Sequence, residues 1–160
     1  MDARRLARKA RLLRWAINLY PPYLGAGVRV RRISPDFRHV RVRMGLSWYN
    51  RNYVGTQFGG SLYSMTDPFF MLMLMHLLGR DYIVWDKAAS IDFIAPGRGP
   101  VYADFRIDDE LLAEIRARTA NGDKYLPELH AEVRDGEGTL VARVHKTLYV
   151  RLKPRLRQAG

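Results

Sequence analysis

A single carboxylate, Asp67, interrupts the most apolar stretch of this 160-residue chain, and no other Asp, Glu, Lys or Arg occurs between Arg51 and Arg80. A carboxylate in such surroundings is costly unless it is paired, hydrogen-bonded or neutral, and burial moves carboxyl groups toward the range useful for proton transfer. Asp67 is therefore a candidate general base or nucleophile. A structural interpretation competes: Asp before Pro68 is a good N-cap arrangement, and residue chemistry alone favours that cap.

A glycine pair lies upstream of this carboxylate. Gly59 and Gly60 stand where a helix is expected to begin, and glycines there expose backbone N–H groups that suit an oxyanion or a phosphate. Adjacent glycines also occur wherever a chain turns tightly, so the pair alone is a weak signal. Polar side chains surround it, and loop hydrogen bonding would equally account for them: Asn52, Thr56, Gln57 and Ser61.

The composition excludes several kinds of chemistry. There is no cysteine, which rules out a disulfide scaffold, cysteine-ligated zinc and a cysteine nucleophile, and suits a reducing cytosol. The four histidines are dispersed without metal-ligand spacing, so no metal is expected, and His76 is read as a satisfied core residue. We find no phosphate-binding loop, dinucleotide fingerprint or nucleophile elbow. The methionines Met71, Met73 and Met75 suggest adaptable packing, against the core or an acyl chain.

Positive charge is concentrated at the two ends of the chain. The net charge is +11, and residues 1–43 and 151–160 carry this excess while residues 44–150 are slightly acidic. This asymmetry predicts an anionic partner, namely a phosphate, a membrane surface or a nucleic acid; a solvated basic face is the equally weighted alternative. Nucleic acid is disfavoured, because the charge lacks aromatic residues interleaved in a binding pattern.

The elements that position these residues follow from periodicity. Residues 3–19 predict a basic amphipathic helix that ends at Pro21-Pro22 and packs on its own domain, with an anionic membrane as the alternative partner. Residues 28–32 and 40–44 predict a hairpin with one arginine face, and residues 48–60 a loop. Residues 61–78 predict one long buried helix ended by Gly79. The remaining predictions are a helix over 108–119 and strands over 88–95, 101–107, 129–134 and 140–144.

This order predicts an α+β domain, with a long helix wrapped by an antiparallel sheet and an extra N-terminal helix. We expect the helix at 1–22, the main domain at 23–152 and a basic tail at 153–160. No signal peptide is recognised, and the apolar run Phe69–Leu78 is too short to span a bilayer. The expected location is cytoplasmic.

The segment Asn52-Tyr53-Val54-Gly55-Thr56-Gln57-Phe58-Gly59-Gly60, with Asp67 seven residues further on, resembles the phenylacetate-type hotdog thioesterases. The sequence is more similar still to the DUF4442 branch of hotdog proteins, through Phe-Gly-Gly, Asp-Pro-Phe-Phe and Ile83-Val84-Trp85-Asp86-Lys87. The resemblance covers roughly residues 28–150.

The resemblance implies a hotdog fold in which two subunits pair their sheets, as a dimer or a tetramer, and bind an acyl-CoA thioester at the interface. The backbone N–H of Gly60 would polarise the thioester carbonyl. Asp67 would come from the facing subunit as base or nucleophile, and Asn52 would orient water or substrate. Basic residues would hold the coenzyme A phosphates, so coenzyme A enters only as part of the substrate. The substrate would lie against the remaining expected site residues, Gln57, Phe58, Gly59, Ser61 and Thr66.

Two departures from that pattern concern the site. Phe58 stands where the better-known enzymes have His, and its ring cannot donate to a carbonyl. Pro68, directly after the acid, predicts a kink that re-aims Asp67. A non-catalytic acyl-CoA or fatty-acyl binder therefore stands beside the thioesterase interpretation, since a fold does not fix a function. A hotdog dehydratase is disfavoured, because it needs a His close to the glycine pair.

Overall fold

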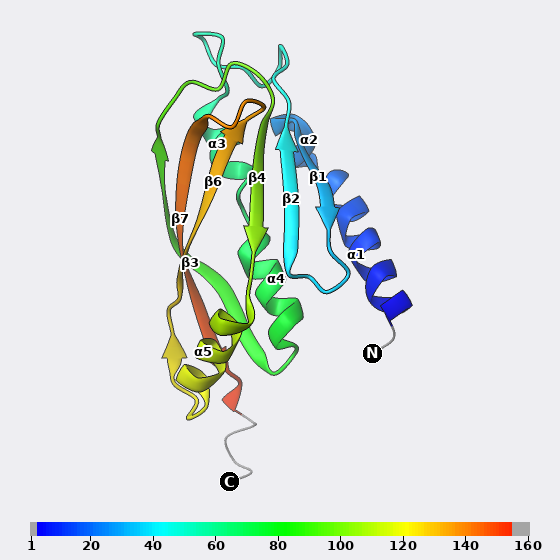
Figure 1. Cartoon of the computed structure of the whole chain (residues 1–160), viewed down its shortest axis with the longest axis vertical. Coiled ribbons are helices and arrows are strands. Elements are labelled where there is room, and N and C mark those ends of the chain that lie inside the picture. The colour runs from blue at the N-terminus through cyan, green and yellow to red at the C-terminus, as the bar shows by residue number, and fades with distance from the viewer. Residues whose placement is uncertain (1–2, 155–160) are drawn as a thin grey trace.

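The computed structural model describes residues 3–154 and forms one sheet packed against two short helices (Figure 1). The elements are, in chain order, α1 (Ala3–Asn18), α2 (Pro21–Ala26), β1 (Val28–Ile33), β2 (His39–Met44), α3 (Gly59–Ser64), α4 (Phe69–Leu78), β3 (Tyr82–Phe93), β4 (Val101–Arg106), α5 (Asp109–Thr119), β5 (Lys124–Tyr125), β6 (Glu128–Asp135) and β7 (Leu140–Leu152). The expected hairpin and the expected helix over 108–119 are confirmed within one residue. Strands β3 and β7 are both longer than predicted.

The sheet is antiparallel in every pairing and runs in the order β1-β2-β4-β6-β7-β3, with the short β5 beside β7. Buried and exposed residues alternate along its strands, because successive side chains point to opposite faces of a sheet. The inner face is apolar and packs on α4, with Val42, Ala103 and Val133 fully buried there. The outer face carries charged and aromatic side chains such as Arg41 and Tyr102.

The helix expected over residues 61–78 is two helices, α3 and α4, and the prediction of one continuous helix is wrong. The physical reason is Pro68, which has no N–H to donate and steers Asp67 away from helical backbone angles. The chain crosses this break through a turn in which the N–H of Asp67 donates to the Ser64 carbonyl. The next helical hydrogen bond runs from Leu72 N–H to the Pro68 carbonyl at 3.0 Å.

Helix α1 covers the free edge of β1. The Asn18 side chain mimics a neighbouring strand: its Oδ1 accepts from the Val30 N–H at 2.7 Å and its Nδ2 donates to the Val30 carbonyl at 3.1 Å. Arg14 also donates to the Arg31 carbonyl. Edge strands with exposed backbone groups template pairing with other chains, so this contact protects one edge of the sheet.

At the opposite edge, β3 pairs with β7 on one side only. It is 12 residues long, and residues 87–90 are all exposed. A bulge interrupts its register with β7 between Asp86 and Ala88. Bulges of this kind re-aim side chains and are enriched beside active sites.

No helix within residues 3–154 is long and apolar enough to cross a membrane. The basic tail expected at 153–160 falls outside the described residues from position 155 onward. The expected division at residues 22 and 152 stays a prediction.

Candidate functional site

Asp67 lies in the break between α3 and α4 and makes an ion pair with Lys146. The Lys146 Nζ donates to the Asp67 Oδ1 at 2.6 Å. Lys146 sits on the inner face of β7, and its side chain is only 2 % exposed, whereas that of Asp67 is 45 % exposed. The pair therefore joins a buried cation to a carboxylate that reaches solvent.

A second carboxylate shares the same ammonium. Asp86, on β3 beside the bulge, accepts from Lys146 Nζ through Oδ2 at 3.2 Å. Its other oxygen, Oδ1, is buried and has no hydrogen-bond partner among residues 3–154. Burial raises the pKa of Asp86, and the charge of Lys146 offsets that effect only in part. Burial acts to lower the pKa of Lys146, but hydrogen bonds and charge from Asp67, then Asp86, raise it overall.

Two tyrosines complete the surroundings of this cluster. The Lys146 ammonium lies 5.4 Å from the centre of the Tyr63 ring, within the range of a cation–π interaction. Tyr23 donates its hydroxyl hydrogen to the backbone carbonyl of Asp67. Burial, then the charge of Asp67, raises the pKa of Tyr23, so this hydroxyl remains a donor. Groups from α2, α3 and β7 thus hold the Asp67 segment in place.

The cap interpretation of Asp67 is wrong, and so is its expected burial. Pro68 occupies the cap position of α4, and no side chain makes a capping hydrogen bond there. The Asp67 side chain instead turns toward Lys146, because an ammonium in the apolar interior stabilises a carboxylate more than a helix end does.

The glycine pair begins α3 as expected. The first hydrogen bonds of the helix run from the Ser61 and Leu62 N–H groups to the Phe58 carbonyl, so the N–H groups of Gly59 and Gly60 precede them. A Cβ at position 60 would lie 2.6 Å from the Phe58 ring, so glycine is required for this approach. The Phe58 side chain itself is 55 % exposed.

Asn52 is engaged in shaping the loop. Its Nδ2 donates to Thr56 Oγ1 at 2.8 Å and its Oδ1 accepts from the Thr56 N–H at 2.9 Å. Gln57 donates to the Gly99 carbonyl, while its Oε1 is buried without a hydrogen-bond partner in the described chain. Asn52, Gln57 and Gly59 line one cavity of about 320 Å³.

The other expected site residues do not line this cavity. Phe58, Gly60 and Ser61 line a second cavity of about 390 Å³, beside Asn50 and Ser64. Thr66 is buried and donates its hydroxyl hydrogen to the Tyr63 carbonyl at 2.7 Å. Among the described residues, Asp67 lines neither cavity. Within one chain, the expected site residues are therefore divided between two cavities and the Asp67–Lys146 ion pair.

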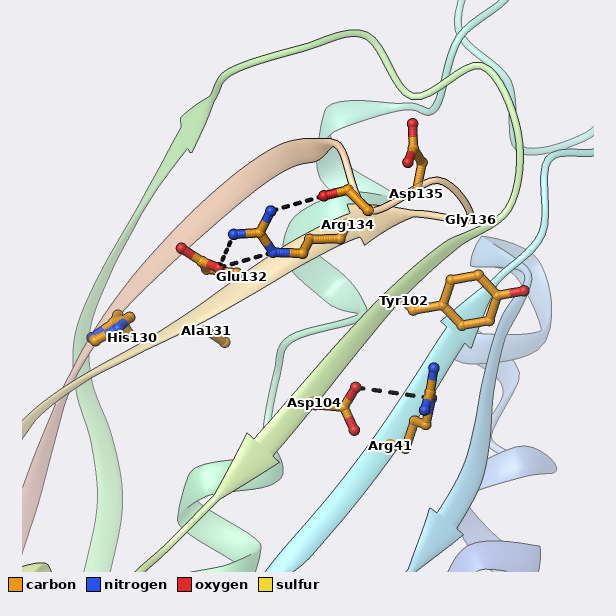
Figure 2. A pocket seen from close by; sticks show the side chains of 10 residues that line it. Arg41, Tyr102, Asp104, His130, Ala131, Glu132, Arg134, Asp135 and Gly136 are labelled. Carbon is orange, nitrogen blue, oxygen red and sulfur yellow. Dashed lines mark hydrogen bonds and ion pairs between the residues drawn. The ribbon is translucent and has the colours of Figure 1, made fainter.

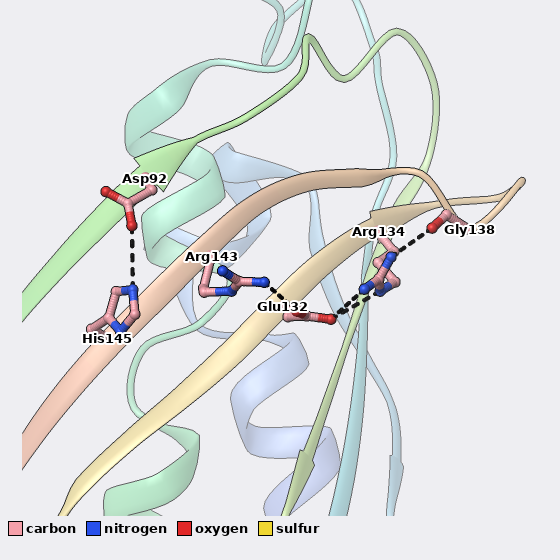
Figure 3. Close-up of polar contacts among 6 residues, drawn as sticks. All are labelled: Asp92, Glu132, Arg134, Gly138, Arg143 and His145. Carbon is pink, nitrogen blue, oxygen red and sulfur yellow. Dashed lines mark hydrogen bonds and ion pairs between the residues drawn. The ribbon is translucent and has the colours of Figure 1, made fainter.

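A larger hollow of about 690 Å³ opens on the outer face of the sheet (Figure 2). Several of its charged side chains form ion pairs. Arg41 pairs with Asp104, and Glu132 accepts from Arg134 and from Arg143 on the next strand (Figure 3). Hydrogen bonds from Arg143, then Arg134, hold the pKa of Glu132 below its ordinary value. This face is a solvated ion-pair surface, and none of the expected site residues lines it.

Lys146 is not among the residues expected at the site, and Asp86 has no expected role there. The signal for Lys146 was present: Ala142, Val144, Leu148 and Val150 share its strand face, and a lysine in that buried register needs anionic partners. Its pairing with Asp67 spans 79 positions, so sequence spacing does not reveal it.

Residues 8–150 match the profile of the family described as Domain of unknown function (DUF4442), so the similarity begins within α1, earlier than residue 28. No curated protein matches the chain.

Several solved structures share the fold. A protein of unknown function from Pseudomonas aeruginosa, described as a probable thioesterase, superposes with a TM-score of 0.77 at 20% identity over 89% of this chain and 95% of that one. A thioesterase from Haemophilus influenzae superposes with a TM-score of 0.65 at 13% identity, over 88% of this chain and 89% of that one. A protein of unknown function from Chlorobaculum tepidum superposes with a TM-score of 0.71 at 18% identity, over 92% of this chain and 96% of that one. These similarities confirm a curved antiparallel sheet packed on central helices.

Proposed function

Because this chain belongs to the DUF4442 family and has the hotdog-type arrangement of its thioesterase-like structural neighbours, we propose that it is a thioesterase that hydrolyses an acyl-CoA. The observation that carries the proposal is the ion pair between Asp67 and Lys146. Water activation or direct attack requires an ionised carboxylate that the substrate can reach. Asp67 fits this requirement, because a buried cation holds it and its side chain reaches solvent.

In the proposed reaction, a water oxygen attacks the thioester carbonyl carbon while Asp67 accepts the proton. The C–S bond then breaks, and the thiol of coenzyme A leaves with a proton, releasing the carboxylic acid. Attack by Asp67 itself, through an anhydride that water then opens, gives the same products. The Gly60 N–H, ahead of the first hydrogen bonds of α3, would stabilise the oxyanion. Coenzyme A takes part only as a portion of the substrate.

The proposal requires a second subunit. Asp67 does not line the cavities that hold Gly59 and Gly60, so a site using both draws them from different copies. The free edge of β3 supports this arrangement, because the other edge of the sheet is covered by α1. Pairing through β3 would also place Asp86, and the cluster that it shares with Asp67, close to the interface.

The loop residues have supporting parts in this proposal. Asn52 acts by holding the loop, since its side-chain hydrogen bonds are made within it. The acyl or pantetheine portion of the substrate lies against the exposed Phe58 ring and the cavity-lining Gln57, Gly59 and Ser61. Thr66 stays behind this surface and fixes the turn that leads to Asp67.

The substitution Asp67→Asn tests the proposal. It keeps the side-chain shape but removes the base, so kcat should fall roughly 10²-fold or more. The assay is a hydrolysis screen over short, medium, long and aromatic acyl-CoAs. Asp109→Asn is the matched control, because Asp109 also forms an ion pair, with Arg38, but its side chain is 92 % exposed. Hydrolysis by Asp67→Asn at the wild-type rate would remove Asp67 from the mechanism.

A non-catalytic acyl-CoA binder on the same fold is the second candidate, and Phe58 favours it. A phenyl ring offers no hydrogen-bond donor to a thioester carbonyl at a position that borders the glycine pair. This function predicts that the wild-type protein binds acyl-CoA by calorimetry and hydrolyses none of the series. If the wild type hydrolyses any acyl-CoA and Asp67→Asn abolishes that hydrolysis, the protein is a thioesterase.

A further inference from the structure

The outward face of α1 combines apolar and cationic side chains. Leu12 and Trp15 lie on α1 and Leu19 follows its last residue, at spacings of three and four residues. The Leu19 N–H donates to the Trp15 carbonyl at 3.1 Å, as in a further helical turn, so the three side chains share one face. They are 58 %, 58 % and 64 % exposed. The opposite face packs on the domain through buried Ala10 and partly buried Ile17. Three large apolar side chains thus remain in solvent although the helix is docked.

Cations surround these apolar side chains. Arg5, Arg8 and Arg11 are exposed on the same helix, which carries no acidic residue from Ala3 to Asn18. Arginine and lysine bury their carbon chains at an interface while their charged ends reach phosphate groups. The sequence of this face is therefore typical of helices that lie in the plane of a membrane surface.

A groove lined mainly by arginines lies beside Trp15. It has a volume of about 470 Å³ and is lined by Trp15, Asn18, Val30 and the four arginines Arg14, Arg29, Arg31 and Arg43. Arg14 and Arg29 use one guanidinium nitrogen each on backbone carbonyls, which fixes them at the α1–β1 junction. Four cations around one hollow without an acidic side chain in its lining favour an anionic occupant.

We propose that this surface, the exposed face of α1 with the arginine groove, binds a bilayer that contains anionic phospholipids. Leu12, Trp15 and Leu19 enter the interfacial region, where tryptophan is favoured, and a lipid phosphate occupies the groove. The surface lies at the edge of the sheet opposite β3 (Figure 1), so subunit pairing through β3 leaves it accessible. The proposal does not depend on thioester hydrolysis.

Charge and polarity distinguish a bilayer from other occupants. A second copy of this face would oppose arginines with arginines, because symmetric pairing brings identical patches together. A soluble phosphate compound would use the groove but not the three exposed apolar side chains. A bilayer satisfies both features at once.

The test is co-sedimentation of the full chain with vesicles of phosphatidylcholine alone or mixed with phosphatidylglycerol. We expect binding to the anionic vesicles only, weakening as salt rises above about 0.1 M. Arg8→Gln with Arg11→Gln should weaken partitioning roughly thirtyfold, or about fivefold for each arginine. Arg116→Gln with Arg118→Gln, two exposed arginines on α5, is the matched control and should leave binding unchanged.

A second pair of variants tests the apolar part. Trp15→Ala should weaken binding to anionic vesicles severalfold, whereas Trp48→Ala, which removes an 82 % exposed tryptophan elsewhere, should not. Melting temperatures verify that both variants fold. Equal binding to neutral and anionic vesicles, no binding at low salt, or equal losses in variant and control would each overturn the proposal. Displacement by inorganic phosphate at matched ionic strength would assign the groove to a soluble anion instead.

Discussion

At the residue scale, Lys146 determines how the carboxylates of the site are held. Within residues 3–154, its ammonium is the group that donates hydrogen bonds to both Asp67 and Asp86, at 2.6 and 3.2 Å. One buried ammonium between two carboxylates leaves a net negative cluster. Lys146 therefore orients the two carboxylates together.

Replacing the ammonium tests this role. Lys146→Met keeps the volume of the buried stem but leaves two carboxylates facing each other without a cation. Removing one partner of a buried pair costs about 3–5 kcal/mol, and since Asp67 is 45 % exposed we expect about 1–3 kcal/mol less stability in urea unfolding. Lys124→Met, on an exposed position of β5, is the control and should change stability little. Equal costs for both would mean that the pair contributes no stability.

Asp86 predicts a pH dependence of stability with a definite sign. Its pKa in the folded protein is raised above the ordinary 3.8, so the folded state binds its proton more tightly than the unfolded state does. The resulting stabilisation is complete below pH 3.8 and is lost as the pH rises through the folded-state pKa. The stability of wild type relative to Asp86→Asn should therefore grow as the pH falls from 7 toward 4.

Asp36 provides a control of opposite sign. Hydrogen bonds, chiefly from Ser34, lower its pKa, so its contribution is lost as the pH falls through the folded value. The stability of wild type relative to Asp36→Asn should stay nearly constant from pH 7 to about pH 4 and shrink as the pH falls below 3.8 in the same urea series. Parallel trends for the two variants would contradict the assignment of the Asp86 shift to burial.

At the element scale, the break between α3 and α4 and the loop before α3 set the site. The loop is held by Asn52, and α3 begins where Gly60 lets the Phe58 ring approach the backbone. This contact makes position 60 sensitive to a single added carbon, because a Cβ there would lie within 2.6 Å of the ring.

Gly60→Ala should lower hydrolysis severalfold by displacing the Phe58 ring and crowding the N–H groups of the helix start. The ring is exposed and can rotate, so the melting temperature should fall only slightly. In a Phe58→Ala background the clash disappears, and the loss due to Gly60→Ala should be smaller. A double-mutant cycle with equal losses in both backgrounds would show that the ring is not the cause.

At the scale of the whole molecule, the two edges of the sheet differ. The side chain of Asn18 bonds both backbone groups of Val30 in β1, whereas β3 presents a long exposed edge. Long exposed edges lead to pairing or aggregation unless a partner covers them. This asymmetry favours an assembly through β3, with the basic face of α1 turned outward.

We predict a stable homodimer at least, with a tetramer as the further possibility. Light scattering at micromolar concentration should give about twice the 18.5 kDa of one chain, or a higher multiple. Arg8→Gln with Arg11→Gln, on the opposite side of the sheet, should leave the mass unchanged. A mass of one chain would remove the shared site and, with it, the proposed chemistry.

Local patterns predicted most of the strands, helices α1 and α5 and the loop of the site, but not helix α2, strand β5 or the break between α3 and α4. Alternation gave the hairpin β1–β2 and strand β4, because residues two apart share a sheet face. The motif from Asn52 to Gly60 placed the start of α3 correctly, since local glycine chemistry depends only on neighbours. Asp67 was recognised as unusual for a local reason as well, its isolation in an apolar segment.

The partners of Asp67 follow from the tertiary structure and not from local sequence. Its partner Lys146 comes from β7 and Asp86 from β3, and the strand register that aligns them depends on sheet pairing and a bulge that no local pattern encodes. The helix break also depends on tertiary contacts, because Pro68 is compatible with either a kinked helix or a helix end. In the folded chain the Asp67 carboxylate turns away from the start of α4 toward the buried ammonium of Lys146. Local propensities are weak compared with the cost of leaving a charge such as that of Lys146 without a partner in the core, and that cost is set by the fold as a whole.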